Sequence, residues 1–198
     1  MINFWDERYS QEEFVYGTEP NEFLKETLTE IKPGKILFPA EGEGRNSAFA
    51  AQLGWDVFAF DSSRIAKEKA TKLYKSNNIN VNYSLCSLEN YECQSNFFDC
   101  IALIFVHPSE DIRKKVHLKL LNYIKPNGIL ILEAFSKDQL KYSSGGPKNK
   151  EMLFSEEIIK NDFGSLNIKL LSSIEKFIYE GEHHKGKAAI IDFIAQKP

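Results

Sequence analysis

The chain has 198 residues, of which 42% are hydrophobic and 27% are charged, which is ordinary usage for a globular α/β domain. A domain of this size buries enough surface to fold without disulfides or a structural metal. Its 25 basic and 28 acidic residues give a formal charge of −3 with no basic block. The charge pattern of a nucleic-acid-binding protein is therefore missing, and we expect a small-molecule partner.

No apolar run approaches the roughly 20 residues that cross a bilayer, and the segment from Met1 to Asp6 lacks the pattern of a signal peptide. We therefore expect a cytoplasmic protein that makes no membrane contact. The three cysteines, Cys86, Cys93 and Cys100, form no Cys-x-x-Cys pair, so we expect buried or half-buried reduced thiols and no metal site. The sequence leaves the oligomeric state open.

In chain order, the first half alternates between helical patterns and short apolar runs. A stripe of apolar residues before Pro33-Gly34 predicts a helix: Phe23, Leu24, Leu28 and Ile31. The short runs are typical of strands buried on both faces of a parallel sheet. The five predicted strands cover residues 35–39, 56–60, 81–85, 99–105 and 128–134. The pattern predicts a doubly wound α/β fold.

In the second half, a further stripe predicts a helix that ends before Pro126-Asn127-Gly128: Ile112, Val116, Leu120 and Tyr123. We expect the hydroxyl of Ser109 to cap the start of this helix. The polar segment 136–150 predicts an irregular loop, which we interpret as a lid over the substrate. A helix over 155–163 follows.

The last part of the chain holds two alternating segments, 167–179 and 187–196, joined by a glycine-rich turn. They predict a hairpin and hence an antiparallel end to a seven-stranded, mostly parallel sheet. No repeat or linker divides the chain. We expect one domain over 1–198, with residues 1–31 as an amino-terminal cap segment and helix.

The most informative stretch is a predicted strand that runs through a glycine loop directly into a helix. Gly42 and Gly44 let the backbone come close to a ligand, and the helix that starts at Gly44 or Arg45 offers unpaired amides. Asp61 closes the second strand, 19 residues after Gly42, which suits a carboxylate that accepts both hydroxyls of an adenosine ribose. The two features together predict a site for a nucleoside cofactor.

The same loop departs from the dinucleotide fingerprint Gly-x-Gly-x-x-Gly/Ala. Ser47 stands at its last position, and Glu41 and Glu43 flank the place of a pyrophosphate. Acidic residues there repel phosphates and favour a cationic ligand. An NAD-dependent oxidoreductase is thus a less favoured alternative.

At this point the residues resemble class I S-adenosylmethionine-dependent methyltransferases, in particular the bacterial kind similar to thiopurine and tellurite-resistance methyltransferases. The resemblance covers almost the whole chain and rests on these segments: 5–9, 16–21, 40–46, Asp61, 98–107, 126–128 and 180–183. The family's usual first motif has an acid and a glycine where this chain has Phe38 and Ala40, and its usual acid after strand three is here Ser87.

The resemblance implies a Rossmann-like methyltransferase fold that binds S-adenosylmethionine and releases S-adenosylhomocysteine. It places the glycine loop against the methionine part of the cofactor and Asp61 at the ribose. The residues that follow strand three border the adenine, and the methyl-transfer site lies at the end of strand four. The implied cofactor-binding residues are Ala40, Glu41, Gly42, Glu43, Gly44, Asn46, Asp61, Ser62, Cys86, Ser87, Leu88, Ile104 and Phe105. Val106 continues the floor of the transfer site.

Several residues are candidates for contact with the methyl acceptor. Those assigned to substrate are Trp5, Tyr9, Tyr16, His107, Glu133 and His183. The aromatic residues could stabilise the sulfonium cation or simply pack as a hydrophobic cap. His107 could act as a general base or cap the next helix.

Adjacent histidines on a strand point to opposite faces, so His183 and His184 beside Glu180 and Glu182 are not expected to bind a metal. The sequence therefore predicts methyl transfer to a small-molecule acceptor of unknown identity. A non-catalytic S-adenosylmethionine-binding module is the alternative that the altered positions leave open.

Overall fold

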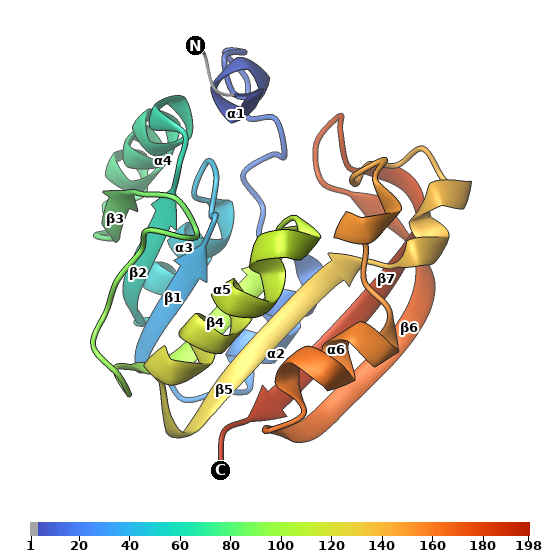
Figure 1. Ribbon diagram of the computed structural model, residues 1–198. Helices are drawn as coiled ribbons and strands as arrows, with labels where there is room; N and C mark the ends of the chain where they lie inside the picture. The colour runs from blue at the N-terminus through green and yellow to red at the C-terminus, as the bar shows by residue number, and fades with distance from the viewer. Residues whose placement is uncertain (1–3) are drawn as a thin grey trace.

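The apolar runs of the sequence form one seven-stranded sheet in the order β3-β2-β1-β4-β5-β7-β6 in the computed structural model, which describes residues 4–198 (Figure 1). The strands are β1 Lys35–Pro39, β2 Asp56–Asp61, β3 Asn82–Leu85, β4 Phe98–Ile104, β5 Ile124–Phe135, β6 Asn167–Tyr179 and β7 Lys185–Gln196. Strands β1 to β5 pair in parallel, and β7 pairs antiparallel to both β5 and β6. The predicted fold class is confirmed, including the antiparallel strand.

Helices cover both faces of the sheet. Figure 1 shows α5 and α6 in front of the strands and α2 and α3 behind them. The helices are α1 Phe4–Arg8, α2 Glu22–Thr29, α3 Arg45–Gln52, α4 Arg64–Ser76, α5 Glu110–Tyr123 and α6 Glu156–Phe163, with short 3-10 turns η1 Lys137–Lys141 and η2 Lys150–Met152. The α5 and α6 side chains pack with one cluster of strand residues, and those of α2 and α3 pack with another. Apolar burial on both faces stabilises this arrangement.

Several strand boundaries differ from the prediction by one or two residues, and two differ because of a left-handed residue. Strand β5 begins at Ile124, so Pro126 to Gly128 lie inside it as an irregularity, with a register shift against β4. Asn127 takes a left-handed conformation there (φ 63°). Strand β4 ends at Ile104, because Phe105 is also left-handed (φ 54°) and turns the chain toward the next segment.

Serine caps begin two helices through their side chains. Ser63 Oγ accepts from the Ala66 amide at 3.1 Å, and Ser155 Oγ accepts from the Ile158 amide at 3.3 Å. The predicted side-chain cap at Ser109 is wrong: its hydroxyl accepts no amide of α5, and its backbone carbonyl accepts from Arg113 instead. The start of α5 is therefore set by backbone geometry.

The segment 136–150 is more ordered than the sequence predicts, because η1 occupies its first part. Buried Gln139 donates from Nε2 to Ser144 Oγ and to the Gly145 carbonyl, and its Oε1 accepts from the Ala189 amide of β7. Ser144 also donates to the Lys187 carbonyl at 2.7 Å. The loop is thus fastened to β7.

Two further sequence expectations can be compared with the structure. The cysteines are free thiols, buried at Cys100 and half-buried at Cys86 and Cys93, as predicted. Among residues 4–198, no helix is long and apolar enough to span a membrane, and no three His, Cys, Asp or Glu side chains are grouped as metal ligands.

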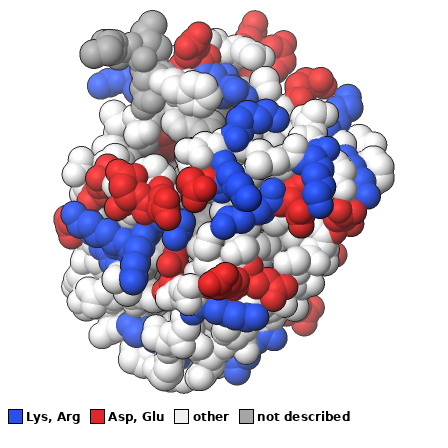
Figure 2. All heavy atoms as spheres, turned by 45° about the vertical axis from the view of Figure 1, so that its right-hand side comes forward, with Lys and Arg blue, Asp and Glu red and all other residues white. Residues whose placement is uncertain are grey.

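Figure 2 shows acidic and basic side chains interspersed on the face turned forward there.

Candidate functional site

A cavity of about 290 Å³ lies beyond the carboxyl ends of β1, β2 and β4. The strand order reverses between β1 and β4, and open α/β sheets bind their ligands at such a point. Most of the predicted cofactor residues line it: Ala40, Glu41, Glu43, Asn46, Asp61, Ser62, Cys86, Ser87, Leu88, Ile104 and Phe105. Gly42 and Gly44 belong to the same loop but do not line the cavity.

The glycine loop has a backbone that requires glycine. Gly44 is the N-cap of α3 with a φ of 90°, and a Cβ there would lie 2.8 Å from the Ala70 side chain. Gly42 has a φ of 68°, and its Cβ would lie 2.7 Å from the Tyr9 hydroxyl. A side chain at either position would be strained and would also collide with α4 or the amino-terminal segment. Glycine at both positions therefore lets the loop lie directly against Tyr9 and Ala70.

Asp61 fastens the loop to the end of β2. Its Oδ2 accepts from the Gly42 amide at 3.0 Å and its Oδ1 from the Ser63 amide at 2.8 Å. The side chain is buried. Burial raises its pKa, and the hydrogen bonds from Ser63 and Gly42 oppose that rise. The Ser62 amide also donates to this carboxylate. A carboxylate has about four lone-pair sites, so one remains to accept from a ribose hydroxyl.

The two acidic residues of the loop have different roles. Glu43 is buried, with Oε1 at 2.5 Å from Lys69 Nζ and Oε2 accepting from the Val15 amide at 2.8 Å. Its charge is therefore already paired. Glu41 accepts from the Ser47 amide at 2.7 Å, and burial raises its pKa to about 7. A cationic ligand would favour the carboxylate form of Glu41.

The amino-terminal segment covers one side of the cavity. Lys69 donates to the backbone carbonyls of Gln11 and Glu13 at 2.9 and 2.5 Å. Ser63 Oγ donates to Asp6 Oδ1 at 2.6 Å, which joins α1 to the start of α4. Residues 1–3 of the predicted cap segment lie outside the described part of the chain.

The three predicted aromatic residues lie together in this cover and line the cavity. Trp5 stacks on Tyr9 with ring centroids 5.6 Å apart, and Tyr9 meets Tyr16 edge-on at 6.3 Å. The rings form a continuous wall that leads from α1 toward the β6–β7 turn. They can pack over a ligand and face a positive charge.

The predicted catalytic role of His107 is not supported by its geometry. Its Nδ1 lies 2.8 Å from the Met152 carbonyl, to which it can only donate, and its Nε2 accepts from the Phe135 amide at 3.2 Å. Burial lowers its pKa to about 4. Although the residue lines the cavity, both ring nitrogens are occupied. His107 instead joins the end of β5 to the segment before α6.

Glu133 does not line this cavity, and its contact with substrate stays a prediction. One oxygen accepts from Asn21 Nδ2 at 2.6 Å, and the other lies 2.5 Å from Lys176 Nζ. These residues line a second, open hollow of about 540 Å³ between α2 and the end of β6. Glu133 therefore joins α2 to β6 from the middle of the sheet.

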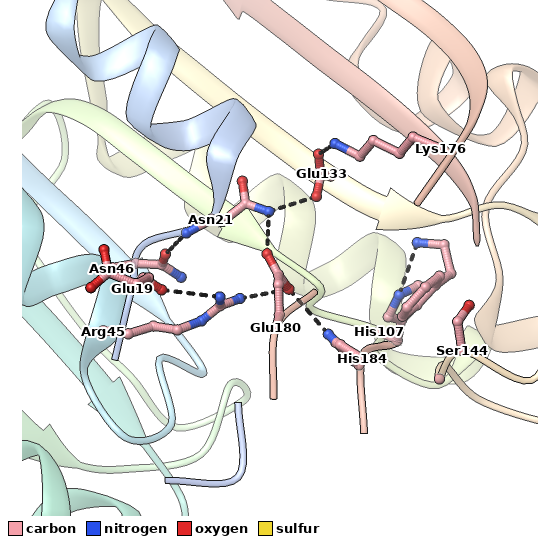
Figure 3. Close-up of polar contacts among 12 residues, drawn as sticks. Glu19, Asn21, Arg45, Asn46, His107, Glu133, Ser144, Lys176, Glu180 and His184 are labelled. Atoms are coloured by element: carbon pink, nitrogen blue, oxygen red, sulfur yellow. Dashed lines mark hydrogen bonds and ion pairs between the residues drawn. The ribbon is translucent and has the colours of Figure 1, made fainter. Parts of the chain in front are cut away.

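Glu180, at the end of β6, is the centre of the polar contacts in Figure 3. Its Oε1 accepts from Asn21 Nδ2 at 2.9 Å, and its Oε2 lies 2.8 Å from Arg45 and 3.2 Å from His184 Nδ1. Burial opposes its ionisation, but the hydrogen bond from His184 and the charge of Arg45 outweigh that effect and lower its pKa to about 2. Glu180 is therefore a carboxylate at neutral pH.

His184, not the predicted His183, lines the cavity. Both histidines lie in the turn before β7 and not on a strand. The imidazole of His184 packs against Tyr16 and Phe105, with centroid distances of 4.5 and 4.7 Å. The turn packs directly against the amino-terminal segment. A Cβ on Gly181 would lie 2.1 Å from the Val15 carbonyl oxygen, so only glycine allows this close approach.

Sequence reasoning gave no role to four polar residues of the site: Asn21, Arg45, Glu180 and His184. Asn21, Arg45 and Glu180 lie within segments that carry the family resemblance and His184 directly follows one. That resemblance was the available signal. Their partners lie on distant elements: Arg45 and Glu180 are 135 residues apart in the sequence, and Asn21 and Glu133 are 112 residues apart. Such pairings have no spacing rule in one sequence.

Residues 36–128 match the family model described as a methyltransferase domain. Among curated proteins, the chain is 28% identical over 124 residues to the ubiquinone biosynthesis O-methyltransferase of Rickettsia typhi, covering 63% of this chain and 50% of that protein. The chain thus spans about half the length of the curated relatives it matches.

Solved structures share the fold across the whole chain. TehB from Haemophilus influenzae aligns with a TM-score of 0.75 and 17% identity, covering 100% of this chain and 67% of that one. An S-adenosylmethionine-dependent methyltransferase from Clostridium acetobutylicum aligns with a TM-score of 0.67 and 16% identity, covering 89% of each chain. The chain has the Rossmann-like methyltransferase fold.

Proposed function

We propose, from the methyltransferase fold and from the cavity at the reversal of strand order, that this chain transfers a methyl group from S-adenosylmethionine to a small molecule. One observation carries the proposal: the glycine turn, the Asp61 carboxylate and the end of β4 line or border a single cavity. Fold alone does not determine function, so the site has to supply the argument.

The residues of the cavity fit S-adenosylmethionine. Asp61 keeps a free lone pair for a ribose hydroxyl beside the glycine turn. Glu41 is a buried carboxyl whose pKa of about 7 would fall beside a cation. Ser62, Cys86, Ser87 and Leu88 border the adjoining part of the cavity and would hold the adenine. A pyrophosphate would instead meet the Glu41 carboxyl, with no basic side chain of the described residues paired to it, which favours a methylating cofactor over NAD.

S-adenosylmethionine supplies an activated methyl group on a sulfonium, so the protein mainly has to align the reactants and exclude water. Ile104 and Phe105 floor the transfer site at the end of β4. Trp5, Tyr9 and Tyr16 close the opposite side. A positive charge against such rings is stabilised by about 0.5–2 kcal/mol each. Alignment between these walls can supply much of the acceleration.

Two groups of acceptors are consistent with the resemblances. The bacterial thiopurine and tellurite-resistance methyltransferases act on sulfur or tellurium, whereas the curated relatives are named O-methyltransferases. The acceptor is therefore proposed only as a small molecule at this stage.

The test is transfer of a labelled methyl group from S-adenosylmethionine to a panel of small hydroxyl, amine and thiol compounds. We expect labelled product with at least one acceptor and inhibition by S-adenosylhomocysteine. Tight binding of S-adenosylhomocysteine with no transfer to any compound would favour the non-catalytic binding module. Binding of NAD instead would favour the oxidoreductase.

A further inference from the structure

We infer that His184 is the general base of this site, that Glu180 positions it, and that the acceptor is accordingly a weakly acidic hydroxyl of the phenol type. This inference rests on the proposed function, because it assigns a role within the methyl-transfer site. It begins from the hydrogen bonds of the histidines.

Among residues 4–198, His184 is the histidine that both lines the cavity and keeps a ring nitrogen without a hydrogen bond. His107 lines the cavity but uses both nitrogens in backbone contacts. His117 lies 2.8 Å from Asp162 between α5 and α6, and His183 does not line the cavity. His184 uses Nδ1 toward Glu180, and its Nε2 makes no hydrogen bond to any described residue.

The partner on Nδ1 determines which nitrogen is basic. Glu180 is held as a carboxylate by Arg45 and His184 and can only accept hydrogen bonds. The proton of a neutral His184 ring therefore lies on Nδ1, which leaves the lone pair on Nε2. A carboxylate that fixes the tautomer of a histidine is the arrangement that orients general bases in other enzymes.

The packing around His184 holds the ring still. Tyr16 and Phe105 lie 4.5 and 4.7 Å from it, centroid to centroid, and Phe135 lies 5.1 Å away. On the remaining side, a Cβ on Gly145 would come within 2.7 Å of His184 Cδ2 and 3.3 Å of Nε2, so only a residue without a side chain leaves the Nε2 edge open there. The loop 136–150 lines no part of the cavity and borders it through this contact. Its role as a lid over the substrate stays a prediction.

The proposed step balances as follows. The acceptor oxygen forms a bond to the methyl carbon while its proton passes to His184 Nε2. The bond from that carbon to sulfur breaks, its electron pair stays on sulfur, and the sulfonium charge disappears. The positive charge is now on the imidazolium, 3.2 Å from the Glu180 carboxylate. His184 then releases the proton to solvent as the products leave.

Acceptors differ in whether they need a general base, and this difference identifies the class of acceptor. A phenol hydroxyl has a pKa of about 10, like that of tyrosine, and is a poor nucleophile until its proton is removed. An aromatic thiol is largely ionised near neutral pH and gains little from a base. A fixed His–Glu pair beside the transfer site is therefore expected for hydroxyl acceptors, and the aromatic walls favour a ring on that acceptor.

The surrounding charges keep His184 in the required form. Burial lowers its pKa, and the hydrogen bond and charge of Glu180 partly offset that effect. The titratable and charged groups around the ring are Glu180, Arg45, His183, His107 and Tyr16. At neutral pH the ring is therefore neutral and able to accept a proton. The rate with a phenol should fall at acidic pH as His184 becomes protonated.

The test compares His184→Asn with His183→Asn, which changes the neighbouring residue outside the cavity. The asparagine amide can replace the Nδ1 donor to Glu180 but offers no base. Each protein is assayed with phenol and with benzenethiol, which share a ring, and is titrated with S-adenosylhomocysteine. Unchanged affinity for S-adenosylhomocysteine shows that the variant is folded and that the cofactor site is intact.

We expect His184→Asn to lower the rate with phenol by about 10²- to 10⁴-fold, the usual contribution of a general base, and to change the rate with benzenethiol less than threefold. His183→Asn should alter neither. Equal losses with both acceptors would show a structural role for His184, and an unchanged rate with phenol would show that it is no base. Methylation of the thiol but not the phenol by the unsubstituted protein would also overturn the inference.

A second readout does not depend on activity. Nitrogen NMR of the imidazole rings should show His184 with its proton on Nδ1 in the free protein, and Glu180→Gln should disturb that tautomer. A ring protonated on Nε2 would contradict the inference. Absence of S-adenosylhomocysteine binding would instead contradict the proposed function, so the two failures are distinguishable.

Discussion

The two halves of the cavity are built in different ways. The cofactor side uses one continuous segment, β1, the glycine loop and α3, closed by Asp61 at the end of the adjacent strand. The acceptor side brings together the amino-terminal cover, the end of β4 and the β6–β7 turn. Contiguous segments leave a sequence signal, whereas contacts between distant elements become visible only once the chain is folded.

The two halves also satisfy their buried acids differently. Asp61 is held by backbone amides of its own neighbourhood, so its partners survive most substitutions. Glu180 is held by the side chains of Asn21, Arg45 and His184. The acceptor side should therefore be more sensitive to single changes and more adaptable to a new acceptor.

The largest effect on stability is expected where the cover is fastened to the cofactor side. Lys69→Met would leave the buried Glu43 carboxylate without its cation and release two backbone carbonyls. Breaking a buried pair in this way costs about 3–5 kcal/mol. Urea unfolding should show this loss, and exposed Lys72→Met serves as the control. A loss below 1 kcal/mol would show that the cover is held by packing.

Glu180→Gln tests the acceptor side through its pH dependence. The folded pKa of about 2 lies below the ordinary 4.5, so the carboxylate contributes stability above pH 4.5 that is lost as the pH falls toward 2. The shift corresponds to about 3 kcal/mol at neutral pH. The stability difference from the unsubstituted protein should shrink as the pH is lowered. Exposed Glu182→Gln in the same turn should show no such difference, and a pH-independent loss at position 180 would contradict this account.

Asp61→Asn tests the cofactor side. Its amide group cannot accept hydrogen bonds from both Gly42 and Ser63 and from a ribose as the carboxylate can. Hydrogen bonds to a charged group contribute about 1.5–3 kcal/mol each, so affinity for S-adenosylhomocysteine should fall about 100-fold. Calorimetry measures this, with Asp56→Asn at the exposed start of β2 as the control. Unchanged affinity would place the ribose elsewhere.

The smallest effect is expected at His107. His107→Asn removes two backbone contacts, to Met152 and Phe135, and should destabilise the fold by about 1–3 kcal/mol. The pH at which the rate with phenol falls on the acidic side should not change, because protonation of His184 is expected to cause that fall. A change of that pH in this variant would return the catalytic role to His107.

Most of the fold is predictable because its signals are local. Short apolar runs predicted β1, β2 and nearly all of β4, and an alternating segment predicted β6. A glycine loop after a strand located the cavity. Boundaries were missed where single residues take unusual backbone conformations, as Phe105 and Asn127 do. Phenylalanine rarely takes a left-handed conformation, and asparagine takes one more often but does not require it. The end of β4 and the start of β5 could therefore not be placed by pattern.

The roles of the polar side chains were less predictable than the location of the site. His107 and Glu133 were sensible candidates because each follows or ends a strand at the functional edge, yet both are occupied by structural partners. Which of two adjacent histidines faces the cavity depends on the conformation of a turn. Sequence spacing specifies neither the turn nor the contact between Glu180 and Arg45.

The central claim is that the cavity beside Asp61 binds S-adenosylmethionine. The most direct measurement is calorimetric titration of the purified protein with S-adenosylhomocysteine, with NAD as the comparison ligand. We predict micromolar, one-to-one binding of S-adenosylhomocysteine and no binding of NAD. Binding of NAD without binding of S-adenosylhomocysteine would contradict the account.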